Sequence, residues 1–192
     1  YTLVACADYI LSKNKGNVVS NLSSSRALRD IAKKHGVQYA ASAVGEVNVV
    51  AKMKEVNAII GGEGNGGIIF PELHYGRDAL VGVALFLSLL TDKNITVSAL
   101  RKSYPAYYMS KNKIELSAGL NPDKVLAAIK ERYAHEPITT IDGVKIDFPN
   151  SWVHLRKSNT EPIIRIYTEA KSQEEADALA QRFLEEMKEL AN

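Results

Sequence analysis

The sequence is poor in several features that mark common protein classes. It has a single cysteine, Cys6, so an internal disulfide is impossible and a reducing, cytoplasmic location is expected. A formal net charge of +2 is too small to indicate the concentrated basic face of a nucleic-acid-binding protein. The most apolar run, ALVGVALFLSLL, has the length of a buried helix and is too short to span a bilayer. We therefore expect no nucleic-acid partner and no membrane association.

Metal-binding patterns and an initiator methionine are also missing. The four histidines have no metal-ligand spacing with one another or with Cys6. No Asp-x-Asp pair occurs, so we expect no metal site in this chain. The first residues, YTLVACADYIL, indicate the opening turns of an amphipathic helix. These features predict that the chain is a fragment of a longer protein.

The first half of the chain alternates between strand-like runs and helical patterns. The expected elements are helices after the Ser23-Ser24-Ser25 cluster and over 78–90, and strands at 18–22, 56–60 and 67–70. The helix over 78–90 is apolar on nearly all sides, so we expect it to be covered on more than one side. This alternation predicts an α/β layered domain over residues 1–104.

The second half has a different pattern. The expected elements are strands at 113–117, 152–156 and 163–169, a hairpin around Asp142-Gly143, a helix from Asn121-Pro122 to Tyr133, and a helix opened by Ser172-x-x-Glu175. The order βαββββα predicts an α+β domain with an antiparallel sheet over residues 113–192. Residues 105–112 are expected to form the hinge between the two domains.

A glycine-rich stretch, GGEGNGG, occupies residues 61–67. From Gly62 it fits G-x-G-x-x-G, but the strand-like run GIIFPE follows where a dinucleotide-binding site needs a helix. A flexible glycine loop would instead bring Glu63 and Asn65 to a ligand. Glu63 can accept two hydrogen bonds from vicinal hydroxyls, and Asn65 can both donate and accept, which is suited to a sugar. The alternative is a tight turn between two strands with Glu63 merely solvated.

Three polar residues follow this loop. His74 and Arg77 either face the same cleft or, as we favour, have a role at the entry to the next helix. Asp78 is interpreted as the N-cap of that helix. Further along, His154 alternates with apolar neighbours and is interpreted as a structural histidine.

A second polar loop, RKSNTEPIIR, joins two expected strands. Its hydroxyl and amide groups, with a guanidinium at each edge, are what a phosphate dianion requires. The candidate phosphate-binding residues are Arg156, Ser158, Asn159, Thr160 and Arg165. The alternative is a polar turn whose side chains satisfy their own backbone.

Together, these two loops resemble those of the α-D-phosphohexomutase family, which has four domains. The third domain of that family carries a sugar-recognition loop, G-E-x-S/N-G, which residues 62–66 match. The fourth carries a phosphate-binding loop, R-x-S-N-T-E-P-x-x-R, which residues 156–165 match at every fixed position. The resemblance implies that the α/β half corresponds to the third domain. The α+β half would correspond to the fourth domain, whose fold resembles the TATA-binding protein.

The resemblance also implies a reaction. In this family a phosphoserine of the first domain exchanges its phosphoryl group with a hexose phosphate through a bisphosphate intermediate, assisted by Mg²⁺ that an Asp-rich loop of the second domain holds. Neither motif occurs here, so this chain is expected to hold no catalytic residue and to be inactive alone. Its expected partners are a hexose phosphate, with a hexose bisphosphate as activator, and the N-terminal domains of the same protein. Glu63 and Asn65 would contact sugar hydroxyls, while the second loop would hold the phosphate that is not reacting.

The sequence departs from the commoner bacterial pattern at three positions. Many members have Ser at 65 and His at 67, where this chain has Asn65 and Gly67, and many have His at the position of Glu46. The form GEGNGG followed by IIFPE is most similar to phosphoglucosamine mutase-type members. Glu46 would then either meet the ammonium of an amino sugar or simply begin a helix.

Several functions stay open at this point. Besides phosphoglucosamine mutase, these are a phosphoglucomutase/phosphomannomutase and a non-catalytic phosphosugar-binding module. A nucleotide-binding oxidoreductase requires that a helix start at Gly66 or Gly67. In the phosphohexomutase interpretation, the two loops are expected to converge on one ligand through closure around residues 103–112.

Overall fold

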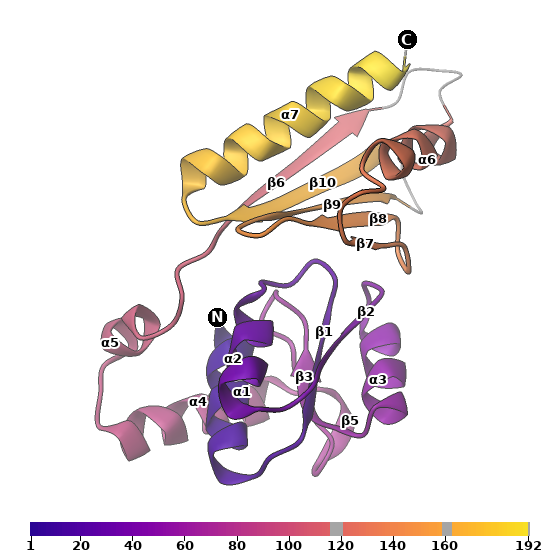
Figure 1. Ribbon diagram of the computed structural model, residues 1–192. Helices are drawn as coiled ribbons and strands as arrows, with labels where there is room; N and C mark the ends of the chain where they lie inside the picture. Colours follow the sequence, from indigo (N-terminus) through magenta and orange to yellow (C-terminus); the bar gives the residue numbers. More distant parts are fainter. Residues whose placement is uncertain (116–120, 159–162, 192) are drawn as a thin grey trace. The chain divides into compact units, whose positions relative to one another are not determined.

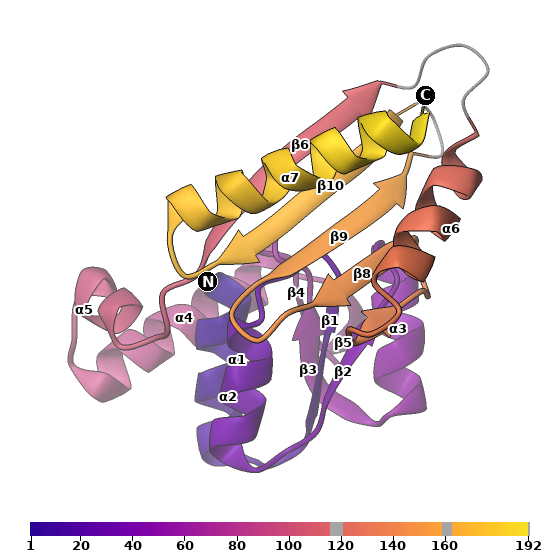
Figure 2. The same ribbon diagram turned by 45° about the horizontal axis from the view of Figure 1, so that its top comes forward.

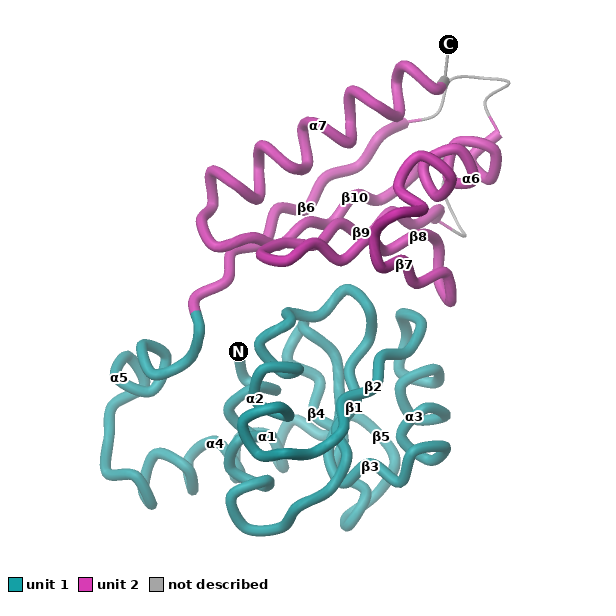
Figure 3. The backbone as a smooth tube through the Cα atoms, in the orientation of Figure 1, with its two compact units in different colours: residues 1–105 teal, residues 106–192 magenta. Residues whose placement is uncertain are grey.

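The computed structural model describes residues 1–115, 121–158 and 163–191. The chain forms two compact units, Tyr1–Pro105 and Ala106–Asn192, which Figure 3 draws in different colours. Each unit has its own β-sheet, and the predicted order of an α/β unit followed by an α+β unit is confirmed. The hinge at 105–112 stays a prediction, and residues from Tyr108 onward belong to a strand.

The first unit, all of whose residues are described, has one mixed sheet in the order β2-β1-β3-β4-β5. Its strands are β1 (Asn17–Asn21), β2 (Tyr39–Ser42), β3 (Ala58–Gly62), β4 (Ile68–Phe70) and β5 (His74–Arg77). Its helices are α1 (Thr2–Lys13), α2 (Ala27–His35), α3 (Glu46–Glu55), α4 (Ala79–Lys93) and α5 (Val97–Lys102). Strand β1 is parallel to β2 and β3, whereas β3, β4 and β5 are antiparallel. Helices α1 and α2 lie on one side of this sheet and α3 on the other (Figure 1).

The core of the first unit explains why β1, β3 and β4 carry apolar residues. Val19 of β1, Ala58 of β3 and Ile69 of β4 pack with Val49 and Met53 of α3. This packing fixes α3 against the sheet. It therefore sets where the residues at the N-terminus of α3 lie relative to the ends of β1 and β3.

The expectation that the helix over 78–90 is covered on more than one side is wrong for this chain. Among the residues of α4, the buried ones are Gly82 and Leu89, whereas Leu80, Val83 and Leu87 are exposed. Helix α1 packs against one side, where the Cys6 thiol donates to the Gly82 carbonyl oxygen at 3.5 Å. An apolar composition shows that a helix can be buried, but it does not show that the same chain supplies the covering element.

The described residues of the second unit form an antiparallel sheet in the order β6-β10-β9-β8-β7. The strands are β6 (Tyr108–Glu115), β7 (Ile138–Thr139), β8 (Val144–Asp147), β9 (Trp152–Lys157) and β10 (Ile163–Ala170). The helices are α6 (Pro122–Arg132) and α7 (Gln173–Ala191), which lie over the same face of the sheet (Figures 1 and 2). Both expected helix starts are confirmed: Asn121 Oδ1 accepts from the backbone N–H of Asp123, and Ser172 Oγ accepts from that of Glu175.

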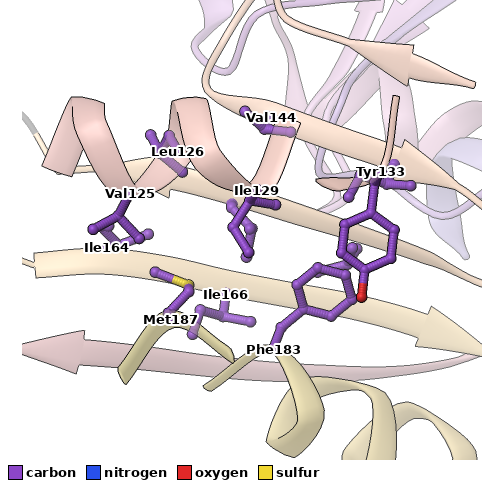
Figure 4. Close-up of a cluster of buried hydrophobic side chains, with 12 residues drawn as sticks. Val125, Leu126, Ile129, Tyr133, Val144, Ile164, Ile166, Phe183 and Met187 are labelled. Carbon is purple, nitrogen blue, oxygen red and sulfur yellow. The ribbon is translucent and has the colours of Figure 1, made fainter. Parts of the chain in front are cut away.

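The core of this unit lies between the sheet and its two helices (Figure 4). Ile164 and Ile166 of β10 contact Ile129 of α6 and Phe183 and Met187 of α7 in one buried cluster. Successive side chains of a strand point to opposite faces of a sheet. The odd-numbered residues of β10 after Ile163, beginning with Arg165, therefore point to the face that these helices leave uncovered.

No helix in the described part of the chain has the length and apolarity that a membrane crossing requires.

Candidate functional site

The glycine loop is a tight connection between the antiparallel strands β3 and β4. The backbone N–H of Glu63 donates to the Gly67 carbonyl oxygen at 3.0 Å, and that of Gly66 donates to the Glu63 carbonyl oxygen at 3.1 Å. Gly66 has a φ of +97°, which an L side chain rarely adopts. Strand β4 begins directly after the loop, at Ile68, so no helix starts at Gly66 or Gly67. The dinucleotide-binding interpretation of this glycine pattern is therefore excluded.

Glu63 is buried, with 6% of its surface exposed, so the alternative in which it is merely solvated is wrong. Its Oε1 accepts from Asn21 Nδ2 at 2.8 Å and from the backbone N–H of Gly45 at 3.3 Å. Asn21 is itself oriented by Ser24, whose hydroxyl donates to Asn21 Oδ1 at 2.8 Å. The end of β1 and the residue before α3 thus hold one oxygen of this carboxylate. A buried carboxylate needs such partners, because its desolvation is otherwise costly.

The other oxygen of Glu63 faces a cation. Glu63 Oε2 lies 3.6 Å from Nη1 of Arg77, the last residue of β5. Arg77 also donates from Nε to Glu46 Oε2 at 2.7 Å and from its backbone N–H to Glu46 Oε1 at 3.0 Å. Arg77 therefore lies between two carboxylates and does not serve only the entry of α4, the role that we favoured from the sequence.

Asp78 and His74, on either side of Arg77 in the sequence, lie at the entry to α4, as expected. Asp78 Oδ1 accepts from the backbone N–H of Val81 at 3.0 Å, which confirms Asp78 as the N-cap of α4. His74 Nε2 lies 3.0 Å from Asp78 Oδ2.

Glu46 begins α3, as one of the two sequence interpretations predicted. The hydrogen bonds from the backbone and the side chain of Arg77 lower the pKa of the Glu46 carboxyl.

Asn65 lies on the outer part of the glycine loop. Its side chain is exposed, and its Oδ1 accepts from the backbone N–H of Gly67 at 3.1 Å. This bond orients the amide group. An amide oriented in this way presents its two N–H donors to a ligand.

The second candidate loop connects β9 and β10. In the register of these strands, Arg156 is directly opposite Arg165, and the backbone N–H of Ser158 donates to the Ile163 carbonyl oxygen at 3.0 Å. The two guanidinium groups therefore project from neighbouring strands at the base of the loop. Arg156 Nε lies 3.6 Å from Asp142 Oδ1. The other two candidates, Asn159 and Thr160, lie outside the described residues.

Two further residues of β9, Lys157 and His154, are held by contacts away from the β9–β10 loop. Lys157 is bonded through Nζ to Asp123 Oδ1 of α6 at 2.8 Å, on the helix-covered side. His154 Nε2 donates to the Asp142 carbonyl oxygen at 2.6 Å, in agreement with its interpretation as a structural histidine. Burial lowers the pKa of His154 to about 4, so its ring is neutral at pH 7.

The described residues hold no group of three or more His, Cys, Asp or Glu side chains arranged to bind a metal ion. The glycine loop of the first unit instead offers a carboxylate and an amide, and the β9–β10 loop of the second unit offers a pair of guanidinium groups. Hydroxyl groups and a phosphate monoester are the ligand groups that these donors and acceptors match.

Comparison with known proteins gives consistent matches to both units. The family described as phosphoglucomutase/phosphomannomutase, alpha/beta/alpha domain III, matches residues 1–108, and the C-terminal domain of the same family matches residues 113–186. A phosphoglucosamine/phosphogalactosamine mutase of Sulfurisphaera tokodaii is 38% identical over 164 residues, which are 84% of this chain and 36% of that protein. A phosphoglucomutase/phosphomannomutase of Thermococcus kodakarensis is 37% identical over 177 residues, which are 91% of this chain and 39% of that protein.

Solved structures have the same fold. The crystal structure of Aspergillus fumigatus N-acetylphosphoglucosamine mutase in complex with GlcNAc-6P and magnesium matches with a TM-score of 0.73 and 17% identity, over 100% of this chain and 43% of that one. The chain thus spans about two fifths of the length of the relatives that it matches.

Proposed function

Because this chain belongs to the phosphoglucomutase/phosphomannomutase family, whose domain III and C-terminal domain it matches, we propose that it is the substrate-binding part of an α-D-phosphohexomutase. The whole enzyme would interconvert hexose 6-phosphate and hexose 1-phosphate through a phosphoserine and a bisphosphate intermediate. In this proposal the present chain supplies recognition and no catalytic residue, and it is inactive alone. We place the enzyme in the cytoplasm.

The observation that carries the proposal is the pairing of Arg156 with Arg165 at the base of the β9–β10 loop. Like charges directly opposite each other on neighbouring strands repel, and an anion bound between them would offset that repulsion. Two guanidinium forks match the oxygens of a phosphate monoester. Ser158 and the two residues of the loop outside the description, Asn159 and Thr160, complete the proposed phosphate site.

The sugar would be held by the glycine loop of the first unit. Glu63 is fixed by Asn21 and Gly45 before any ligand arrives, and a group that is already oriented needs no reorganisation on binding. Asn65 adds donors from an exposed position. In phosphoryl transfer, positioning and electrostatic stabilisation supply most of the catalysis, which explains why recognition can occupy whole domains.

Glucosamine phosphate is the substrate that we favour. Its support is the GEGNGG and IIFPE pattern, together with the likeness to a phosphoglucosamine/phosphogalactosamine mutase. Glucose and mannose phosphates are the alternative, which the similarity to a phosphoglucomutase/phosphomannomutase supports.

Magnesium belongs to the proposed whole enzyme, since the Aspergillus fumigatus relative was crystallised with it. The described residues of this chain do not fit the ion, because they hold no suitable cluster of acidic, His or Cys side chains. We therefore assign the metal, and the serine that is phosphorylated, to N-terminal domains that would be partners of these two units. A hexose bisphosphate would act as the activator.

Calorimetric titration of the 192-residue chain with glucosamine 6-phosphate and with inorganic phosphate tests whether the β9–β10 loop binds the phosphate and the glycine loop binds the sugar. Arg165→Ala is expected to weaken binding of both ligands roughly tenfold or more, because it removes a charge-assisted contact. Asn65→Ala, at an exposed position, should weaken only glucosamine 6-phosphate. Lys188→Ala on α7 is the control and should change neither. Undiminished phosphate binding by Arg165→Ala would refute the proposed phosphate site.

A further inference from the structure

A groove of about 360 Å³ lies over strands β6 and β10 of the second unit. Its lining residues are Lys111, Asn112, Lys113, Ile163, Arg165 and Tyr167. The groove therefore shares Arg165 with the proposed phosphate site but extends away from the β9–β10 loop, onto a strand that no sequence motif singled out. Ligand pockets begin at about 300 Å³, so this groove has room for more than a single ion.

The strand register places a third cation beside the two arginines. Lys113 of β6 is directly opposite Arg165 of β10, and Arg165 is directly opposite Arg156 of β9. Directly opposed residues on antiparallel strands have Cβ atoms about 4.5–5.5 Å apart. Lys113, Arg165 and Arg156 thus form one row across three neighbouring strands, which we call the cationic row.

Two residues of the cationic row, Lys113 and Arg156, lie near acidic side chains. Lys113 Nζ lies 3.8 Å from Glu115 Oε1, and both side chains are largely exposed, at 59% and 81%. Arg156 Nε lies 3.6 Å from Asp142 Oδ1. An exposed ion pair of this length contributes little to stability, so Glu115 offsets little of the charge of Lys113.

The groove also contains a pair made of a cation and an aromatic ring, Lys111 and Tyr167. Lys111 is directly opposite Tyr167, and its Nζ lies 5.5 Å from the centre of the Tyr167 ring. The groove thus has a cationic side at Lys113 and Arg165 and an aromatic wall at Tyr167. Such a mixture is suited to a ligand that carries a phosphate on a less polar body.

We propose that Lys113 is a phosphate-binding residue, and that the groove between Lys113 and Arg165 is a subsite for the phosphate monoester of a phosphorylated sugar. This inference rests on the proposed function, because it assigns Arg165 to the same anion. It adds a residue from β6 to a site that the sequence motif confines to β9, β10 and their loop. A third cationic donor would let the site hold a dianion from two sides.

NMR titration of the ¹⁵N-labelled 192-residue chain with inorganic phosphate, at constant low ionic strength, tests the assignment. Lys113→Gln is expected to weaken phosphate binding roughly five- to tenfold, because it removes one charged donor. Lys157→Gln is the matched control: it removes the same charge next to the same loop, but from the helix-covered face, where Lys157 pairs with Asp123. Lys113→Arg keeps the charge and should retain most of the affinity.

The outcomes separate this inference from the proposed function. Selective weakening by Lys113→Gln, with shifts of the Lys113 and Tyr167 amides in the unmodified chain, supports the subsite. If Lys113→Gln behaves like Lys157→Gln while Arg165→Ala loses binding, the subsite is overturned and the proposed phosphate loop stands. If neither Lys113→Gln nor Arg165→Ala weakens binding, both are overturned.

Discussion

The guanidinium of Arg77 connects two carboxylates that are far apart in the sequence. Glu46 Oε1 accepts from the backbone N–H of Arg77 at 3.0 Å and Oε2 accepts from Arg77 Nε at 2.7 Å, while Glu63 Oε2 lies 3.6 Å from Arg77 Nη1. A carboxylate whose two oxygens are already bonded to one arginine is not an obvious partner for the ammonium of an amino sugar. Glu46 is better understood as the residue that holds Arg77 next to Glu63.

Glu46→Gln separates these two roles. If Glu46 acts through Arg77, the substitution should weaken binding of glucosamine 6-phosphate and of glucose 6-phosphate by a similar factor, roughly three- to tenfold. Calorimetric titration of both sugars against both proteins measures this ratio, with Lys52→Gln further along α3, where Lys52 pairs with Glu55, as the control. A loss confined to the amino sugar would show that Glu46 contacts the ammonium group.

The sequence predicts the loop residues of the candidate site but not most of the residues that hold them. Glu63 and Arg165 lie in short motifs, so local spacing is sufficient to find them. Arg77, which the sequence suggested could face the same cleft, lies beside Glu63. Asn21 and Gly45 contact Glu63 from two other segments, and only the strand order brings these segments together. Polar contacts between segments so far apart in the chain leave no local pattern to detect.

Among the secondary-structure elements, those with strong local signals were predicted best. Asn121-Pro122 and Ser172-x-x-Glu175 open helices in the structure, because a cap depends on only three or four neighbouring residues. The strand expected at 113–117 instead begins at Tyr108. Its first residues are extended because they pair with the C-terminal end of β10, and the sequence of a single strand does not contain its partner.

Helix α4 shows the difference between an apolar residue and a buried one. Leu87 and Leu89 are chemically identical, but 56% of Leu87 is exposed and only 1% of Leu89. Leu89→Ala is expected to lower the free energy of unfolding by about 2–5 kcal/mol, because it leaves a cavity. Leu87→Ala should change it by less than about 1 kcal/mol. Urea denaturation of the two variants, followed by circular dichroism, measures both values, and equal losses would contradict the packing of α4.

At the scale of the whole chain, each unit contains one buried group whose pKa is lowered, Asp8 in the first unit and His154 in the second, and the causes differ. In the first unit, the buried carboxylate of Asp8 accepts from Lys34 Nζ at 3.1 Å, from Lys93 Nζ at 3.2 Å and from the Tyr104 hydroxyl at 3.1 Å, and it lies 2.8 Å from His35 Nε2. Burial alone would raise the pKa of Asp8, but the hydrogen bonds from His35 and Lys34 outweigh it and lower the pKa from 3.8 to about 2. In the second unit, burial lowers the pKa of His154 from 6.5 to about 4.

These shifts predict different pH ranges for the loss of stability in the two units. A folded-state pKa below the unfolded value means that the unfolded chain takes up the proton first, so stability falls as the pH drops between the two values. For His154 this range runs from pH 6.5 to about 4, and the loss approaches about 3 kcal/mol. For Asp8 it runs from pH 3.8 to about 2, with a loss of about 2 kcal/mol. As the pH falls, the second unit should therefore weaken before the first.

Hydrogen exchange resolved by residue measures the two losses separately, because each unit has its own sheet and buried core. Amides of β9 and β10 should lose protection between pH 6.5 and 4, after correction for the intrinsic pH dependence of exchange, while those of β1 and β3 keep theirs. His154→Gln should remove the first loss and Asp8→Asn the second, since each replaces the titrating group with a neutral one of similar shape. Simultaneous loss in both units at one pH, unchanged by either substitution, would mean that these two side chains do not control the acid sensitivity of the chain.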